Sequence, residues 1–556
     1  MRSTFYGLDI ASKGLFVAQR QLDVMGHNVA NANTEGYSRQ RFITAAVPAP
    51  GVMGKFAPMS KGQVGHGVET LSLDQIRDRF LDRQYRQEVA KTSYWDTRAS
   101  ALYYVEDVFN GTADTRLDAI ISRFFNSAQE LTKNPTDQSI RTTLLKSAEH
   151  LTTVMHEYHS QLVDLMYQQD YMLTVQADVI NQYSKQIAAL NDSILRFEQG
   201  GQIANDLRDH RNLLLDKLAT LVDISYEEMG IGKYSINGRE LTTMMVTIGP
   251  ERDLLIGHTE YIELISEPDS SIDNYVVDSM DSDALHTVRF GEVKDYRPDR
   301  EPTFTYQDLG LFPDFPSDGD AVIFGGGELK SYLDMRDGIN SEDIRDGAVG
   351  IPYYIRQLDI LAQALVEEFN RVHTEGWTMP YTDADGNDWD SRNGVLFFAV
   401  PGDPPEYDAP WITAGNIRLS EDILASVFNI AASGETVLRD EDGHFHTGNN
   451  ENALRFISDV KERNDIDYIG SFEGFFKSFI AELAAEVSSA NQMYSAEAVL
   501  TDSIQAQRLS VMSVSLDEEM LDMVRFQHAY NAAARALTTM DEMLEVMINR
   551  MGRVGL

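Results

Sequence analysis

The sequence of 556 residues contains no cysteine. This absence excludes disulfides, thiolate metal sites, iron–sulfur clusters and cysteine nucleophiles, so the fold must depend on packing alone. The sequence also lacks a run of about 18 apolar residues, so we expect no membrane-spanning helix. Charged side chains interrupt the apolar positions of residues 1–40. We therefore expect no cleaved signal peptide.

Basic residues are scarce: 47 Lys and Arg stand against 87 Asp and Glu, for a formal net charge of −40. A chain this acidic is not expected to bind nucleic acid or an anionic membrane through bulk electrostatics. The excess of acid is concentrated in residues 201–500, whereas both ends of the chain are nearly neutral. This distribution predicts that the middle faces solvent and that the two ends face other protein.

Both ends carry apolar residues at alternating spacings of three and four, which is the pattern of a helical seam. The N-terminal seam consists of Leu8, Ala11, Leu15, Ala18, Leu22, Met25, Val29 and Ala32. The C-terminal seam includes Leu516, Met520, Met523, Tyr530, Ala534, Leu537, Leu544, Ile548 and Met551. No Pro or Gly interrupts residues 516–551. A helix this long needs a partner from the same chain or a neighbour; alternatively, each is an ordinary amphipathic core helix.

The segments between the ends alternate between helical and strand-like patterns. Helices are predicted over 113–134, 136–166, 168–199, 202–222, 328–337, 351–373 and 471–510. Asn134-Pro135 and Gly200-Gly201 are the clearest breaks. Residues 224–324 are β-branched and rich in turns, with a hairpin signal at Asn237-Gly238, and residues 377–450 are irregular.

The predicted fold class is mainly α with β-rich insertions. Terminal helices pair as a coiled coil, long helices form a bundle stalk, and β-rich material faces outward. The chain is predicted to begin with an N-terminal assembly helix and loop (1–55) and to end with a C-terminal assembly helix (511–556). The helical stalk is formed by 56–225, 326–376 and 451–510. A β-rich insert (226–325) and an irregular or β-containing insert (377–450) separate these three parts.

No motif that carries chemistry survives inspection. Asp383–Asp388 begins like a calcium loop, but glycine falls at the fourth place and the twelfth place is Gly394, so an Asx-rich turn is favoured. His156 and His159 lack a third ligand, which favours a solvated helix face over a metal site. Residues 325–327 lack the Lys and Ser/Thr of a phosphate loop and read as a loop entering a helix. We therefore expect no enzyme, no metal and no cofactor.

One segment directly after the first predicted helix is more distinctive. It contains Asn31, Asn33, Thr34, Gly36 and Tyr37, followed by Ser-Arg-Gln, and has more asparagine than a helix cap needs. This run resembles the N-terminal signature of bacterial flagellar rod, hook and hook-associated proteins. Further stretches over 201–218, 327–373 and 515–543 resemble the hook-associated members of that family.

The resemblance implies a structural axial protein of the flagellum, in the junction zone that connects hook to filament and is needed for filament assembly. It implies export by the flagellar type III apparatus without a cleaved signal peptide, and an extracellular location. The implied partners are other copies of the chain, hook protein, a second junction protein and an export chaperone on the C-terminal helix. The terminal helices would be largely disordered in the monomer and become ordered on assembly.

The two seams, together with the role that the resemblance implies for the asparagine-rich segment, predict an assembly interface. Its members are Leu8, Leu15, Leu22, Val29, Asn31, Asn33, Thr34, Gly36, Tyr37, Leu516, Met520, Met523, Tyr530, Ala534, Leu537, Leu544 and Ile548.

Three alternatives stay open at the level of sequence. The chain could be another axial protein, such as a hook or distal rod protein. It could be an enzyme fused to axial ends, which would require a catalytic acid in 377–450. It could also be a surface-binding module in which 226–325 recognises a glycan or a protein.

Overall fold

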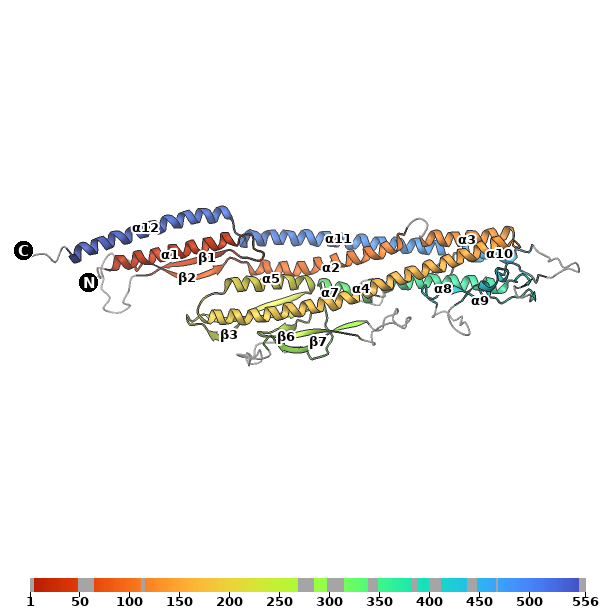
Figure 1. Cartoon of the computed structure of the whole chain (residues 1–556), viewed down its shortest axis with the longest axis horizontal. Coiled ribbons are helices and arrows are strands. Elements are labelled where there is room, and N and C mark those ends of the chain that lie inside the picture. The colour runs from red at the N-terminus through yellow and green to blue at the C-terminus, as the bar shows by residue number, and fades with distance from the viewer. Residues whose placement is uncertain are drawn as a thin grey trace, which may run out of the picture.

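The computed structural model describes residues 5–48, 65–111, 116–268, 285–297, 315–338, 349–382, 388–399, 412–437, 448–466 and 469–549. The molecule is long and mainly helical, with both termini at the same end (Figure 1). The Asx-rich turn predicted over Asp383–Asp388 lies outside the described residues except for Asp388. No helix among the described residues is long and apolar enough to cross a membrane.

The two termini are brought together by a pair of helices, α1 (Tyr6–Ala30) and α12 (Leu516–Asn549), which lie side by side and run in opposite directions (Figure 1). We call α1 and α12 the terminal pair. The strands β1 (Gln40–Ala46) and β2 (Val68–Gln75) form an antiparallel ladder beside α1. These two strands were not predicted from the sequence.

The body of the molecule is a bundle that we call the stalk, formed by α2 (Arg79–Phe109), α3 (Leu117–Lys133), α4 (Gln138–Gln199), α8 (Ile351–Glu375) and α11 (Phe472–Met512). Helix α2 packs along α11, and α3 along α4 (Figure 1).

Helix α4 is a single helix of 62 residues. The prediction of separate helices over 136–166 and 168–199 was wrong, because neither Pro nor Gly occurs between 138 and 199 to end the first of them. The predicted break before α4 is confirmed: Asp137 caps the helix by accepting a hydrogen bond from the Ser139 amide at 2.7 Å. At the other end Gly201 has φ +80°, a conformation that favours glycine.

A five-stranded antiparallel meander lies against the stalk, as the pattern in 224–324 predicted. Its strands are β3 (Ile224–Tyr234), β4 (Glu240–Ile248), β5 (Asp253–Ile256), β6 (Glu260–Pro268) and β7 (His286–Asp295), in chain order. The predicted hairpin joins β3 to β4, with Gly238 at φ +77°. Helix α4 packs on the sheet, with α5 (Asn205–Leu221) and α7 (Gly327–Asp337) beside it (Figure 1).

The far end of the stalk is built around an aromatic core. Phe369 on α8 stacks on Phe456 with ring centroids 4.6 Å apart, and Phe124 and Phe397 pack on the same ring. The remaining short elements surround this core: β8 (Tyr381–Thr382), β9 (Asp388–Trp389), β10 (Phe398–Ala399), β11 (Arg418–Leu419), α9 (Glu421–Ala425), η3 (Val427–Asn429), α10 (Glu451–Arg455) and η4 (Phe456–Lys461).

Candidate assembly interface

The terminal pair is in contact along much of its length. A Cβ atom built on Gly7 would lie 2.9 Å from Cε of Met540, and one on Gly14 would lie 3.9 Å from Cβ of Ala533. At the opposite end of α1, the Asn28 side chain reaches α12. Small residues on one helix therefore allow close approach of the other.

The structure brings the two predicted seams into one region but covers them only in part. Most of the predicted seam residues are half-buried: Leu8, Leu15, Leu22, Val29, Met523, Tyr530, Ala534, Leu537 and Leu544. Three are exposed, namely Leu516, Met520 and Ile548, the last at 69%. Leu516 and Met520 lie near the start of α12, and Ile548 lies near its end.

A second row of apolar side chains on α12 is open to solvent. It consists of Leu521, Val524, Met543, Val546 and Met547. Among the described residues of α12, Glu519 is the only one whose side chain is fully buried. The single chain therefore leaves much of the apolar surface of α12 without a cover.

The asparagine-rich segment folds back on its own helix and on α5. Asn31 Nδ2 donates to the His27 carbonyl at 3.0 Å, and Thr34 Oγ1 donates to Asn31 Oδ1 at 3.3 Å. Gly36 has φ +79°, and a Cβ atom there would lie 3.1 Å from Leu213 Cβ on α5. A larger residue at position 36 would be strained. Asn33, by contrast, is exposed.

Tyr37 connects this segment to the interior. Its hydroxyl donates to Asn28 Oδ1 at 2.8 Å. Burial raises the pKa of Tyr37 well above its ordinary value, and the nearby carboxylates of Asp206 and Asp209 raise it further. The phenol therefore stays protonated and acts as a donor.

Asn28 on α1, Arg39 in the loop after α1 and Glu519 on α12 form a joint between the two terminal helices, in which Asn28 and Glu519 are buried and Arg39 is half-buried. The Glu519 side chain, 0% exposed, accepts from Arg39 Nε at 2.7 Å and from Asn28 Nδ2 at 3.1 Å. Arg39 Nη1 also donates to the exposed Glu518 at 2.8 Å. The prediction did not include Asn28, Arg39 or Glu519, because no single stretch of sequence shows that positions 491 residues apart meet.

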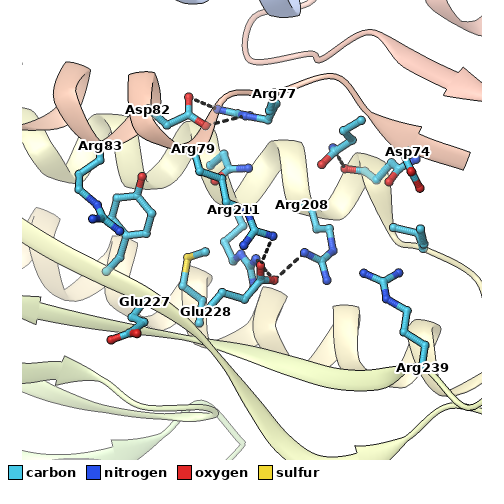
Figure 2. A pocket seen from close by; sticks show the side chains of 16 residues that line it. Asp74, Arg77, Arg79, Asp82, Arg83, Arg208, Arg211, Glu227, Glu228 and Arg239 are labelled. Atoms are coloured by element: carbon cyan, nitrogen blue, oxygen red, sulfur yellow. Dashed lines mark hydrogen bonds and ion pairs between the residues drawn. The ribbon is translucent and has the colours of Figure 1, made fainter.

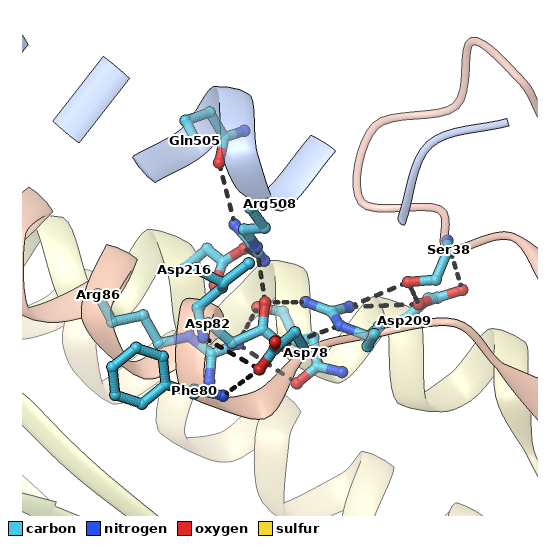
Figure 3. Close-up of polar contacts among 12 residues, drawn as sticks. Ser38, Asp78, Phe80, Asp82, Arg86, Asp209, Asp216, Gln505 and Arg508 are labelled. Atoms are coloured by element: carbon cyan, nitrogen blue, oxygen red, sulfur yellow. Dashed lines mark hydrogen bonds and ion pairs between the residues drawn. The ribbon is translucent and has the colours of Figure 1, made fainter. Parts of the chain in front are cut away.

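A second cluster of charges ties this joint to the stalk (Figure 3). Ser38 donates to Asp209 through its amide at 3.0 Å and its hydroxyl at 2.6 Å, and Arg77 bridges Asp209 to Asp82 at 3.3 and 3.0 Å. Arg508 on α11 then binds Asp82 at 2.6 Å. We call Ser38, Arg77, Asp82, Asp209 and Arg508 the joint cluster.

In the joint cluster, burial and charge pairing act in opposite directions on the pKa of the carboxylates. Burial alone would raise the pKa of Asp82, but Arg77, Arg508 and Arg86 lower it below its ordinary value. The Asp82 carboxylate is thus held in its charged form, whereas burial raises the pKa of Asp209 above its ordinary value although Ser38 and Arg77 act against it. The cluster connects the loop after α1 to α2, α5 and α11 and fixes the terminal pair to the stalk.

The structure tests the prediction that His156 and His159 lie on a solvated helix face. Burial lowers the pKa of His159 to about 4, and only 2% of its surface is exposed, so the predicted solvated helix face was wrong for this residue. The His156 ring bonds the Ile417 carbonyl at 2.6 Å. No group of three or more metal-ligating side chains occurs in the part of the chain that the structure describes. Residues 325–327 lead into α7, as predicted.

Comparison with known protein families identifies three matching segments. Residues 102–279 match the helical domain of flagellar hook-associated protein FlgK. Residues 505–551 match the C-terminal domain of flagellar basal body rod FlgEFG proteins, and residues 8–37 match the flagella basal body rod protein family. The two rod-type matches fall on α12 and α1.

Whole-chain relatives give the same result. The chain is 30% identical to flagellar hook-associated protein 1 of Bacillus subtilis over 100% of both chains. It is 24% identical to flagellar hook-associated protein 1 of Salmonella typhimurium over 97% of this chain and 98% of that one. The structure of the flagellar hook junction protein FlgK from Burkholderia pseudomallei shares the fold, with a TM-score of 0.52 at 15% identity, over 78% of this chain and 100% of that one. The chain therefore belongs to the flagellar hook-associated protein 1 family, whose members are structural components of the bacterial flagellum.

Proposed function

We propose that this chain forms the junction zone between hook and filament, and that it self-assembles there through α1 and α12. The observation that carries the proposal is the incomplete cover of α12, whose predicted seam is only half-buried and whose second apolar row is exposed. Exposed apolar rows of this kind mark protein interfaces. The names of the relatives support the place in the flagellum.

The assembly interface proposed from the sequence is retained, with α1 and α12 pairing as a coiled coil that also meets neighbouring subunits. Burial of apolar surface stabilises such contacts by about 25 cal/mol per Å² before the ordering entropy is subtracted. The ends of the chain are ordered by that burial. The joint cluster holds the terminal pair on the stalk. The sheet domain faces outward and takes no part in the contact between neighbouring subunits.

The partners that follow are other copies of the chain, hook protein on one side and a second junction protein on the other. Before assembly the apolar rows of α12 would favour aggregation, so an export chaperone covers this helix. The chain leaves the cell through the flagellar type III apparatus without a cleaved signal peptide. It performs no catalysis, and its role is mechanical.

The first test is deletion of the gene, with electron microscopy of the cells and an assay of flagellin in the medium. Hooks without filaments, together with flagellin lost to the medium, are expected. Normal filaments would contradict the junction role. Loss of hooks altogether would place the protein lower on the axis, in the rod or hook.

The second test separates the interface from the fold. Leu537→Asp places a charge in the half-buried seam of α12 and should block incorporation while the stalk stays folded. Asn531→Asp adds the same charge at an exposed polar position of the same helix and serves as the matched control. Incorporation of Leu537→Asp at the level of the control would remove the seam from the interface.

A further inference from the structure

An arginine-lined cleft lies away from the terminal pair, between the start of α2, α5 and the β3–β4 hairpin (Figure 2). Its volume is about 460 Å³, within the range of sites that hold small ligands. Six guanidinium groups line it: Arg77, Arg79, Arg83, Arg208, Arg211 and Arg239. In a chain with a net charge of −40, such a concentration of basic side chains needs a physical reason.

Four carboxylates also line the cleft, those of Asp74, Asp82, Glu227 and Glu228, and acidic side chains pair with some of the six arginines but not with all of them. Glu228 binds Arg208 at 2.6 Å and the rim residue Arg79 at 2.8 Å, and Arg208 also binds Glu198 at 2.7 Å. Burial alone would raise the pKa of Glu228, but Arg208, Arg211 and Arg79 lower it to about 2. The Glu228 carboxylate is therefore charged under all ordinary conditions.

Arg211, at the floor of the cleft, does not have a hydrogen-bond partner for every donor of its guanidinium group. Its side chain is 2% exposed, and Nη1 donates to Asn191 Oδ1 at 2.9 Å. Its Nε atom is buried without a hydrogen-bond partner, and the nearest approach to Glu228 is 3.6 Å. An unpaired donor on a buried cation is costly, and a bound acceptor removes that cost.

The rim of the cleft holds arginines without acidic partners. Among the described residues, no carboxylate forms an ion pair with Arg239 or Arg83. Figure 2 shows Arg239 reaching from the hairpin toward Arg208 on α5, with no interaction drawn between them. Like charges that face each other across a cleft repel, and an anion between them converts that repulsion into attraction.

We propose that this cleft is a binding site for an anion that carries several carboxylate or phosphate groups. Guanidinium forks bind such oxygens in pairs, and several forks along one cleft select a ligand with more than one anionic group. The bound anion connects α2 and α5 of the helical body to the β3–β4 hairpin. The proposal does not rest on the junction role: none of the cleft residues belongs to the two seams or the asparagine-rich segment, although Arg77 and Asp82 are also members of the joint cluster.

The anion has two possible sources, a free polyanion or an acidic segment of a neighbouring protein. Calorimetry on the full chain at matched ionic strength, with pyrophosphate, citrate and a hexaglutamate peptide as probes, distinguishes them. Tighter binding of the peptide than of either small anion assigns the site to an acidic segment. Equal or tighter binding of a small anion assigns it to a free ligand.

Arg239→Gln removes one exposed guanidinium and should weaken binding about tenfold or more, because a charge-assisted hydrogen bond is lost. Arg239→Lys keeps the charge without the fork and should bind at an intermediate level. The matched control is Arg252→Gln, an exposed arginine in the turn after β4 that does not line the cleft. Absence of binding by all three probes at millimolar concentration would overturn the proposal. So would equal binding by Arg239→Gln and Arg252→Gln.

Discussion

The stalk and the terminal pair are both built from long helices, but they bury their apolar faces very differently. On α4, Leu144, Leu151 and Leu162 are fully covered within one chain. On α12 the apolar seam is half-buried at best, and the fully covered side chain there is the acidic Glu519. Helix length therefore does not decide how much of a helix's apolar face is buried within the chain. The stalk has its partners within the chain, whereas the terminal pair has an apolar surface that neighbours can cover.

The largest effect should come from the stalk. Phe369→Ala empties the centre of the aromatic core, where its ring stacks on Phe456, and should lower the free energy of unfolding by about 3–5 kcal/mol. Denaturant unfolding followed by circular dichroism measures this. The control is Tyr103→Ala on α2, because that ring is 59% exposed and its loss should change stability by less than about 0.5 kcal/mol. Similar losses of unfolding free energy in both variants would show that the stalk does not depend on its buried aromatic core.

The joint should show a local effect of similar size. Arg39→Ala leaves the buried Glu519 carboxylate without its cation, which should destabilise the local contact by about 3–5 kcal/mol. Hydrogen exchange should then speed up in α12 and in the loop after α1, while α4 keeps its protection. Arg525→Ala is the control, since Arg525 is 76% exposed and its ion pair is long at 3.9 Å. Faster exchange throughout the stalk would show that the joint also supports the bundle.

Acid should weaken the stalk and the sheet domain before it affects the terminal pair. Burial lowers the pKa of His159, His258 and His373 to about 4 in the folded protein. Unfolded histidine binds protons near pH 6.5, so stability is full above that pH and falls as the pH drops toward about 4, by about 1 kcal/mol per pH unit for each histidine. Denaturant midpoints measured across this range test the slope. A flat profile would contradict buried neutral histidines.

The smallest effect is expected on the open face of α12. Met543 is 49% exposed, so Met543→Ala should change the stability of the isolated chain by less than about 0.5 kcal/mol. If neighbours cover this row, the same variant should weaken incorporation into flagella. An equal effect on the isolated chain and on incorporation would show that Met543 acts within the chain only.

Local patterns in the sequence predicted most of the elements. The seams gave α1 and α12, Asn134-Pro135 marked the start of α4, and Asn237-Gly238 marked the β3–β4 hairpin. Each of these depends on residues close together in the chain, where periodicity and turn chemistry act directly. The seven-part division of the chain and the coiled-coil geometry of the terminal pair stay predictions.

Contacts between distant residues could not be predicted from local patterns. Arg508 and Asp82 are 426 positions apart, and with 87 acidic residues no single pairing stands out from the sequence. The strands β1 and β2 were missed for a similar reason, because their pairing joins two segments separated by a long connection. His159 was placed on a solvated face because its cover comes from residues 200 or more positions away, near Asp359 and Gly415.

The pairing of α1 with α12 also has a consequence for the order of folding. Asn28 and Glu519 are separated by 491 positions, so α1 must wait for nearly the whole chain to be made before its partner exists. Contacts of such long sequence separation carry a high loop-closure entropy and form slowly. The α3–α4 pair and the sheet domain can close through nearer contacts first, whereas the packing of α2 along α11 also waits for the end of the chain. Because α1 and α12 stand at opposite ends of the sequence, the helix pair proposed to meet neighbouring subunits can form only when synthesis of the chain is nearly complete.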